Sequence, residues 1–100
     1  MANKEIKTEQ APAAIGPYSQ GISAENIAFV SGQLPIDPAT GEFAGNDIAS
    51  QTRQSLKNVQ AILAENGMTM ADVTKTTVLL ADIAEFAEMN QAVSYTHLRA

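Results

Sequence analysis

The chain has 100 residues, of which 45% are hydrophobic and 17% charged, and its formal net charge at pH 7 is −5. This composition is typical of one small globular domain and excludes a disordered chain. Its six basic residues are scattered, so neither nucleic acid nor an anionic membrane is expected as a partner. The chain has no cysteine, no signal-peptide core and no apolar run near the ~18 residues of a membrane span, and a cytoplasmic protein is expected.

The first part of the chain predicts short strands separated by loops. Apolar or alternating residues mark the strand segments, which are residues 5–8, 22–25, 27–31 and 33–36. The second and third of these are expected to form a hairpin that turns at Glu25 and Asn26. Pro35 favours an edge or an exit for the last. Residues 11–21 are a loop by composition, and residues 37–41 (DPATG) are a turn.

A long helix is predicted between Asn46 or Asp47, the candidate N-caps, and Asn66-Gly67, which favour a helix C-terminus. Steps of three and four residues mark its buried face, which consists of Ile48, Thr52, Leu56, Val59, Ile62 and Leu63. Polar residues mark the opposite face, which consists of Gln51, Gln54, Lys57, Asn58 and Glu65.

After this helix, residues 73–80 (VTKTTVLL) are rich in β-branched and apolar side chains and predict a strand. Asp82 and Glu85 have the spacing of a capping box, so a second, shorter helix is expected to begin at Ile83. The apolar stripe expected for this helix is Ile83, Phe86 and Met89 or Asn90.

The order strand, hairpin, long helix, strand and short helix favours an α+β fold, in which a sheet carries its helices on one face. Such a layout normally has another strand after the second helix, and the sequence contains no convincing one. We therefore expect a sheet from which the last strand or strands are missing, with an open edge.

The usual catalytic motifs are absent. His97 is the only histidine, which excludes a histidine metal cluster, and no serine lies in a nucleophile elbow. No Gly-rich nucleotide loop occurs, and the carboxylates show no pairing of the kind that hydrolyses glycosides. The sequence therefore indicates neither a histidine or thiolate metal site nor a nucleotide-binding loop.

Two glycine-containing segments remain as candidates for a ligand site, IGPYSQG (15–21) and VSGQLP (30–35). The first presents Tyr18 in a stiff loop. The second places Ser31 and Gly32 at a strand end, where a glycine lets a ligand approach the backbone closely. These groups suit a small polar ligand that carries a carboxylate. Tyr18 as an amphipathic edge residue and Gly32 as a β-bulge remain as alternatives.

Four segments resemble the RidA (YjgF/YER057c/UK114) family in order and spacing, up to about Asn90. They are APAAIGPYSQG, FVSGQLPIDPATGE, QTRQSLKNVQAIL and KTTVLLADIAEFAEMN. The resemblance implies a chorismate-mutase-like α+β fold and a homotrimer with active sites in the clefts between subunits. It also implies hydrolysis of reactive 2-imino acids and their enamine tautomers, which pyridoxal-phosphate dehydratases release, to 2-keto acids and ammonia without a cofactor.

The same resemblance assigns roles to single residues. Tyr18 matches the family's active-site tyrosine, and Ser31 and Gly32 match residues that line the pocket, the glycine through its backbone. Asn90 matches an asparagine at the same cleft, and Phe86 matches an aromatic position near it. Two alternatives remain open, namely Phe86 as a core residue and Asn90 as a helix C-cap.

The implied reaction is compatible with these residue types. A protonated imine carbon is already electrophilic, so its hydrolysis requires neither a metal nor a covalent nucleophile. The site has to hold the substrate carboxylate, place one water and stabilise the tetrahedral carbinolamine by directed hydrogen bonds. We expect Tyr18 and Ser31 to perform the last two tasks.

The family also implies an arginine that grips the carboxylate and a glutamate that positions water, both after the four segments. Residues 93–100 (VSYTHLRA) do not resemble the family and read like a translated sequencing-library adapter. We expect an incomplete RidA-like domain over residues 1–92 and a non-native tail over 93–100. Arg53 is expected on a solvated helix face, and the surroundings of Arg99 do not match the family's arginine. The chain alone is then expected to be inactive, unstable and prone to aggregation.

Three other functions compete with an imine deaminase. The first is a non-catalytic ligand-binding or regulatory protein of the same fold, which would keep the Tyr18 loop. The second is an RNA-acting protein, which the acidic composition disfavours. The third is an interaction module that uses the face of the long helix.

Overall fold

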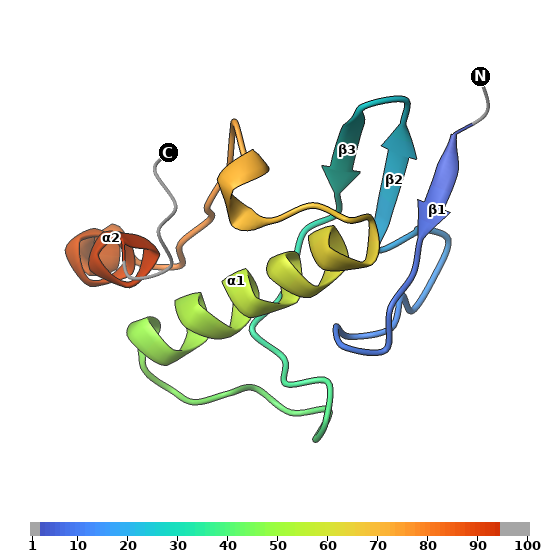
Figure 1. The fold of residues 1–100 in the computed structure, drawn as a ribbon. Helices are drawn as coiled ribbons and strands as arrows, with labels where there is room; N and C mark the ends of the chain where they lie inside the picture. Colours follow the sequence, from blue (N-terminus) through green and yellow to red (C-terminus); the bar gives the residue numbers. More distant parts are fainter. Residues whose placement is uncertain (1–2, 95–100) are drawn as a thin grey trace.

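The computed structural model describes residues 3–94 (Figure 1). Its elements in chain order are β1 (Lys4–Ile6), β2 (Gly21–Ala24), β3 (Ile27–Val30), α1 (Ile48–Glu65), η1 (Met70–Asp72), η2 (Ile83–Glu85) and α2 (Phe86–Ser94), where η denotes a 3-10 helix. A small antiparallel sheet and two α-helices confirm the predicted α+β class. Within residues 3–94, no helix combines the length and the hydropathy that a membrane-spanning helix requires.

The three strands form one antiparallel sheet in the order β1-β2-β3. Ile22 in the central strand pairs with Glu5 on one side and with Phe29 on the other. The hairpin between β2 and β3 turns at Glu25, whose φ of 57° lies in the left-handed region. The predicted hairpin is confirmed, and β1 is an edge strand over Lys4–Ile6 rather than over the predicted residues 5–8.

Beyond β3 the chain does not continue as a strand, contrary to the prediction for residues 33–36. Ile36 makes only an isolated bridge to Phe43. Between them the predicted turn is present, since the Gly41 N–H donates to the Asp37 carbonyl at 2.8 Å and Gly41 has a φ of 76°. Residues 33–36 therefore add no strand to the sheet, because the bridge joins Ile36 to a residue of the same loop.

Helix α1 has the predicted caps. The Asp47 carboxylate accepts a hydrogen bond from the Ser50 N–H at 2.9 Å, and this bond holds the pKa of Asp47 below its ordinary value. Asn66 is the C-cap, and Gly67 follows with a φ of 73°. A side chain is rarely tolerated at such an angle, which explains why a glycine stops the helix there.

The predicted polar face of α1 is wrong at one position. Asn58 is fully buried, with 0% of its surface exposed. Its amide nitrogen donates to the carbonyls of Leu34 at 3.1 Å and Ile36 at 2.9 Å, and its oxygen accepts from the Gln54 amide at 2.9 Å. Burial of this amide is tolerated because its nitrogen and its oxygen are both hydrogen-bonded. The same hydrogen bonds tie the loop after β3 to the helix.

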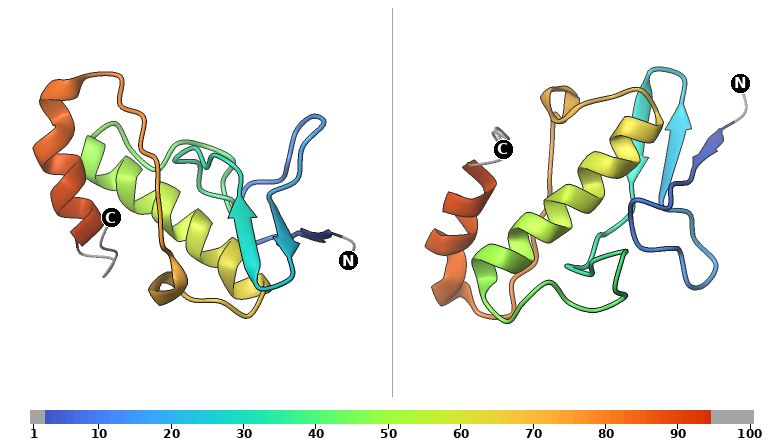
Figure 2. Two further views of the ribbon diagram at one scale, coloured as in Figure 1. Left: turned by 90° about the horizontal axis from the view of Figure 1, so that it is seen from above. Right: turned by 60° about the horizontal axis from the view of Figure 1, so that its bottom comes forward.

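Helix α1 separates two groups of buried apolar side chains. The group between α1 and the sheet consists of Ile6, Ala11 and Ile62, and the group between α1 and α2 consists of Leu56, Leu63, Met70, Met89 and Val93. Figure 2 shows α2 lying along α1 on the side away from the three strands. Only α1 therefore covers the strands, and α2 contributes by covering α1.

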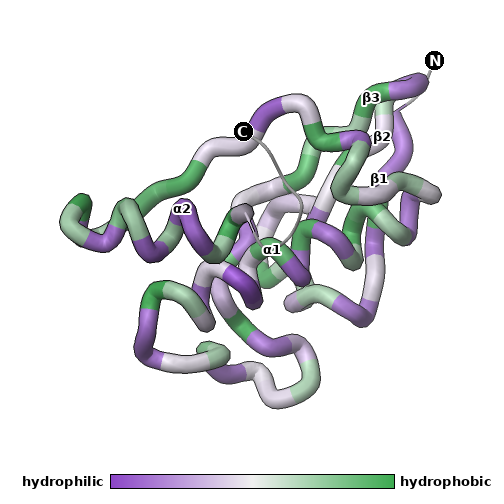
Figure 3. The backbone as a smooth tube through the Cα atoms, turned by 60° about the vertical axis from the view of Figure 1, so that its left-hand side comes forward, coloured by the Kyte–Doolittle hydropathy of each residue, from purple (hydrophilic) through white to green (hydrophobic). Residues whose placement is uncertain are grey.

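The strand predicted over residues 73–80 is not formed. This segment runs as an extended connection from η1 to η2 (Figures 1 and 2), and no backbone N–H of residues 74–81 donates to another described residue. Part of the segment that leads into α2 is hydrophobic (Figure 3), yet Leu79 is 91% exposed. High strand propensity describes a fit to a sheet, and a strand still requires a neighbour that supplies backbone partners.

The second helix begins with η2, which Asp82 caps through a hydrogen bond from the Ala84 N–H to its carboxylate at 2.9 Å. The expected apolar stripe is wrong at Ile83 and Phe86, which are 79% and 52% exposed. The buried face of α2 instead consists of Met89, Ala92 and Val93. The 3-10 turn changes the angular position of the first residues, because three residues per turn replace the 3.6 of an α-helix.

Candidate functional site

The loop before β2 presents Tyr18 at the surface. The Tyr18 N–H donates to the Gly16 carbonyl at 2.9 Å, and Gly16 has a φ of 125°, a conformation that requires glycine. The Tyr18 side chain is 50% exposed, and its hydroxyl makes no hydrogen bond with another described residue. The phenol therefore retains both its donor and its acceptor capacity for a ligand.

Ser31 joins the end of β3 to the Tyr18 loop. Its hydroxyl donates to the Ser19 carbonyl at 2.6 Å, and its N–H donates to the Gln20 carbonyl at 3.0 Å. The hydroxyl proton is thus engaged within the protein, while the oxygen can still accept a hydrogen bond from a ligand or a water. Two hydrogen bonds make the strand end and the loop one unit.

Gly32 lies just beyond this junction and is exposed. Its backbone N–H donates to no described residue, and a Cβ placed on it would meet no atom within 4 Å. The fold therefore does not require glycine here for packing within one chain. An open N–H at such a position can bind a carboxylate directly.

Gln20 is a polar residue of this region to which the sequence patterns assign no role. Its side chain is only 3% exposed, although it lies two positions from the half-exposed Tyr18. A polar side chain in a loop carries no periodicity that would predict burial, and only its hydrogen bonds in the folded loop explain it.

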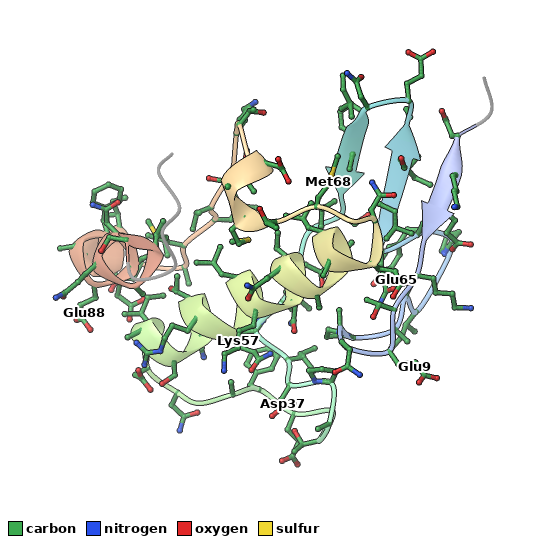
Figure 4. The ribbon with its side chains drawn as sticks, viewed as in Figure 1. Glu9, Asp37, Lys57, Glu65, Met68 and Glu88 are labelled. Carbon is green, nitrogen blue, oxygen red and sulfur yellow. The ribbon has the colours of Figure 1, made fainter. Side chains whose placement is uncertain are left out.

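Phe86 and Asn90 lie far from the Tyr18 loop within one chain. Both are on the exposed side of α2, and Asn90 is inside the helix, so neither the core alternative for Phe86 nor the C-cap alternative for Asn90 is correct. Glu88 marks α2 in Figure 4 and Glu9 marks the loop region near β1, and the two side chains point outward at opposite ends of the molecule. Figures 1 and 2 show the same separation between α2 and the loop.

No group of three or more His, Asp or Glu residues within residues 3–94 is arranged to hold a metal ion. Arg53 is exposed on α1, in agreement with the prediction of a solvated position. Arg99 and His97 lie outside the described residues. The described candidate site thus consists of a phenol, a serine oxygen and a backbone N–H.

Several proteins are similar in sequence to most of this chain. The profile of a family described as Endoribonuclease L-PSP matches residues 8–97. A RutC family protein of Pyrococcus abyssi is 51% identical over 94 residues, which are 94% of this chain and 74% of that protein. The 2-iminobutanoate/2-iminopropanoate deaminase of Escherichia coli is 50% identical over 88 residues, which are 88% of this chain and 68% of the enzyme.

Solved structures agree with this relationship. A Rid family protein from Yersinia pestis, described as of unknown function, superposes with a TM-score of 0.92 at 43% identity, over 95% of this chain and 75% of that one. Identity at this level, together with the same fold, indicates common descent rather than fold likeness alone. The chain therefore belongs to the RidA family, which is the Endoribonuclease L-PSP family of the matching profile.

Proposed function

We propose that this protein hydrolyses small 2-imino acids to 2-keto acids and ammonia. The observation that carries the proposal is the 50% identity to a deaminase of this type, combined with an unpaired phenol and an open backbone N–H at one rigid junction. The described residues around this junction include no thiol and no histidine, which fits a reaction that needs only a polarised C=N bond and a positioned water.

The proposed reaction adds water across the imine. The water oxygen forms a bond to the imine carbon, the π electrons of the C=N bond move to nitrogen, and the water proton leaves to solvent or to a neighbouring base. Proton transfer to nitrogen then lets the C–N bond of the carbinolamine break, which yields the 2-keto acid and ammonia. One water is consumed, and no electrons are exchanged with a cofactor.

The residues take the roles that their free groups allow. The Gly32 N–H binds the substrate carboxylate, and the Tyr18 hydroxyl donates a hydrogen bond to the substrate nitrogen as the C=N electrons move there. Ser31 accepts a hydrogen bond from the attacking water, since its own proton is engaged with Ser19. The largest contribution is expected from Tyr18, whose hydroxyl is wholly available.

We also propose that the site is completed between protomers of a homotrimer. Helix α2, which carries Phe86 and Asn90, and the loop before β2, which carries Tyr18, lie on opposite sides of α1 in Figures 1 and 2, so a second protomer is needed to bring them to one substrate. The sheet face opposite α1 exposes Ile27 by 55% and Phe29 by 65%, and uncovered apolar surface of this kind favours association. Sedimentation of the product of the uninterrupted reading frame in the ultracentrifuge tests this part, and a monomer of that protein at all concentrations would contradict it.

The predicted domain over residues 1–92 and the predicted non-native tail over 93–100 stay predictions, as do the additional arginine and glutamate and the inactivity of the chain alone. Genomic DNA from the source, sequenced through the codon of Gln91, tests them directly. The same codons continuing into VSYTHLRA would contradict the non-native tail. A cytoplasmic location also remains part of the proposal.

The function is tested by ammonia release from freshly generated 2-iminopropanoate and 2-iminobutanoate. Both the 100-residue chain and the product of the uninterrupted reading frame are assayed. Tyr18→Phe removes one hydroxyl and is expected to lower kcat on the order of a hundredfold, which is the usual cost of one transition-state donor.

Absence of turnover in both proteins would contradict the deaminase. Binding of 2-keto or 2-imino acids without turnover would then support the non-catalytic alternative. The family description Endoribonuclease L-PSP favours RNA as a second candidate substrate. A net charge of −5 opposes this, and RNA cleavage or binding that weakens steeply with salt would be required to accept it.

A further inference from the structure

We propose that Gln20 is a positioning residue, which acts through Tyr18 by clamping the loop that carries it. This inference rests on the proposed function for its effect on catalysis. It rests on the hydrogen bonds of the Gln20 side chain for its effect on structure. Gln20 itself is buried and is not expected to touch the substrate.

The Gln20 side chain holds the preceding loop through both ends of its amide. Its oxygen accepts from the Thr8 N–H at 2.7 Å. Its nitrogen lies within hydrogen-bond distance of three carbonyl oxygens, those of Thr8 at 3.0 Å, Ala11 at 3.2 Å and Pro12 at 2.8 Å. Two amide hydrogens are thus shared among three acceptors, and one side chain fastens residues 8–12 to the segment after Tyr18.

The backbone of the same residue completes the connection to the strand end. The Gln20 carbonyl accepts from the Ser31 N–H at 3.0 Å, and the neighbouring Ser19 carbonyl accepts from the Ser31 hydroxyl at 2.6 Å. The segment after Tyr18 is therefore held from two sides, by β3 on one and by the 8–12 loop on the other. Tyr18 projects from this segment, and its side-chain hydroxyl makes no hydrogen bond with another described residue that would hold the ring in place.

An apolar substitution of Gln20 should make the segment after Tyr18 more mobile without creating a cavity in the core. Gln20→Met keeps a similar volume and removes every side-chain hydrogen bond. The partners left behind belong to a loop in which Thr8 and Pro12 are partly exposed, so water can replace some of the lost bonds. The expected result is a folded protein in which the Tyr18 ring samples a wider range of positions.

Fluorescence tests this effect without reference to activity. The chain has no tryptophan and two tyrosines, so Tyr95→Phe makes Tyr18 the sole emitting residue. In that background Gln20→Met is expected to lower the fluorescence anisotropy of Tyr18 and to raise its quenching by acrylamide. The control is Gln51→Met, which removes another amide clamp, the 2.9 Å hydrogen bond to the Gly45 carbonyl at the start of α1. Unchanged anisotropy in Gln20→Met, or equal changes in both variants, would overturn the proposal.

Kinetics test the link to Tyr18. In the form of the protein that turns over imines, Gln20→Met is expected to lower kcat on the order of tenfold, because small misplacements of a catalytic group are costly. In the Tyr18→Phe background the same substitution is expected to have almost no effect on kcat, since the group that it positions is gone. Additive losses in the double variant would show a general structural role and would overturn the proposal.

A measurement on the unmodified chain covers the case in which Gln20→Met does not fold. The amides of Thr8 and Ser31 are expected to be protected from hydrogen exchange to a similar degree, because both belong to the same clamp. Exchange of the Thr8 amide at the rate of an open chain would overturn the proposal. If neither protein hydrolyses imines, the proposed function fails, whereas the fluorescence and exchange results still decide whether Gln20 fixes Tyr18.

Discussion

The loop-and-hairpin region of residues 8–36 and the connection of residues 73–86 differ in how their backbones are held. In the first region, the buried amides of Gln20 and Asn58 tie the loops to the rest of the molecule. In the second, residues 74–81 donate no backbone hydrogen bond to another described residue, and Leu79 is 91% exposed. Irregular segments are therefore held in place when buried side chains satisfy their backbone groups, while a segment of high strand propensity stays unpaired without a neighbour.

The largest expected difference between the two regions concerns packing. Ile62 is fully buried between α1 and the sheet, beneath the hairpin that carries the candidate site. Ile62→Ala should lower the free energy of unfolding by ~2–5 kcal/mol, because it removes buried methyl groups and leaves a cavity. Leu79→Ala, the matched control in the connection, should change it by less than about 0.5 kcal/mol. Chemical denaturation measures both values, and equal losses would contradict the contrast.

A smaller effect separates two glycines of the first region. A Cβ at Gly21 would lie 3.0 Å from the Ile62 Cγ2 and 3.1 Å from the Phe29 carbonyl oxygen. Gly21→Ala should therefore destabilise the fold by ~1–3 kcal/mol through overpacking. Gly32→Ala meets open space and should leave stability nearly unchanged.

The Gly32→Ala variant also tests whether Gly32 binds the substrate. If its N–H receives the substrate carboxylate, the added methyl group of Gly32→Ala should raise KM while the melting temperature stays the same. A variant that loses stability, or one that binds and turns over substrate normally, would remove Gly32 from the proposed site.

Amide exchange should report the contrast along the backbone. The Ser31 N–H is hydrogen-bonded to the Gln20 carbonyl, and the amides of residues 74–81 have no such partner in the described structure. We expect Ser31 to exchange at least about tenfold more slowly than residues 74–81, which corresponds to ~1.4 kcal/mol. Strong protection throughout residues 74–81 would indicate that another chain pairs with this segment in solution.

The smallest expected effect concerns the cap of α1. The hydrogen bond from the Ser50 N–H lowers the folded-state pKa of Asp47, so the charge of Asp47 stabilises the fold at pH values above its ordinary pKa of 3.8. This contribution is lost as the pH falls through the lower, folded-state pKa. Asp47→Asn keeps the acceptor but not the charge. The difference in melting temperature between the two proteins should be constant near neutral pH and shrink in acid, and a difference that grows in acid would contradict this account.

Local signals in the sequence determined the ends of α1, the turns and the family of this protein. Helix α1 lies between Asp47 and Gly67 because a side-chain acceptor and a left-handed glycine act within one turn of the helix ends. The hairpin at Glu25 and the turn closed by Gly41 follow from similarly short-range preferences. The family was also recognisable, since its four segments keep their order and spacing and include Tyr18 with its glycine neighbours.

The tertiary structure alone decided which polar groups are buried, which segments pair and which site residues meet. Asn58 and Gln20 are buried because distant carbonyls satisfy their amides, and residues 74–80 remain unpaired because no described strand lies beside them. The separation of α2 from the loop before β2 likewise depends on how α2 packs against α1 (Figure 2). These outcomes depend on contacts between residues far apart in sequence, and the periodicity of a single segment carries no information about such contacts.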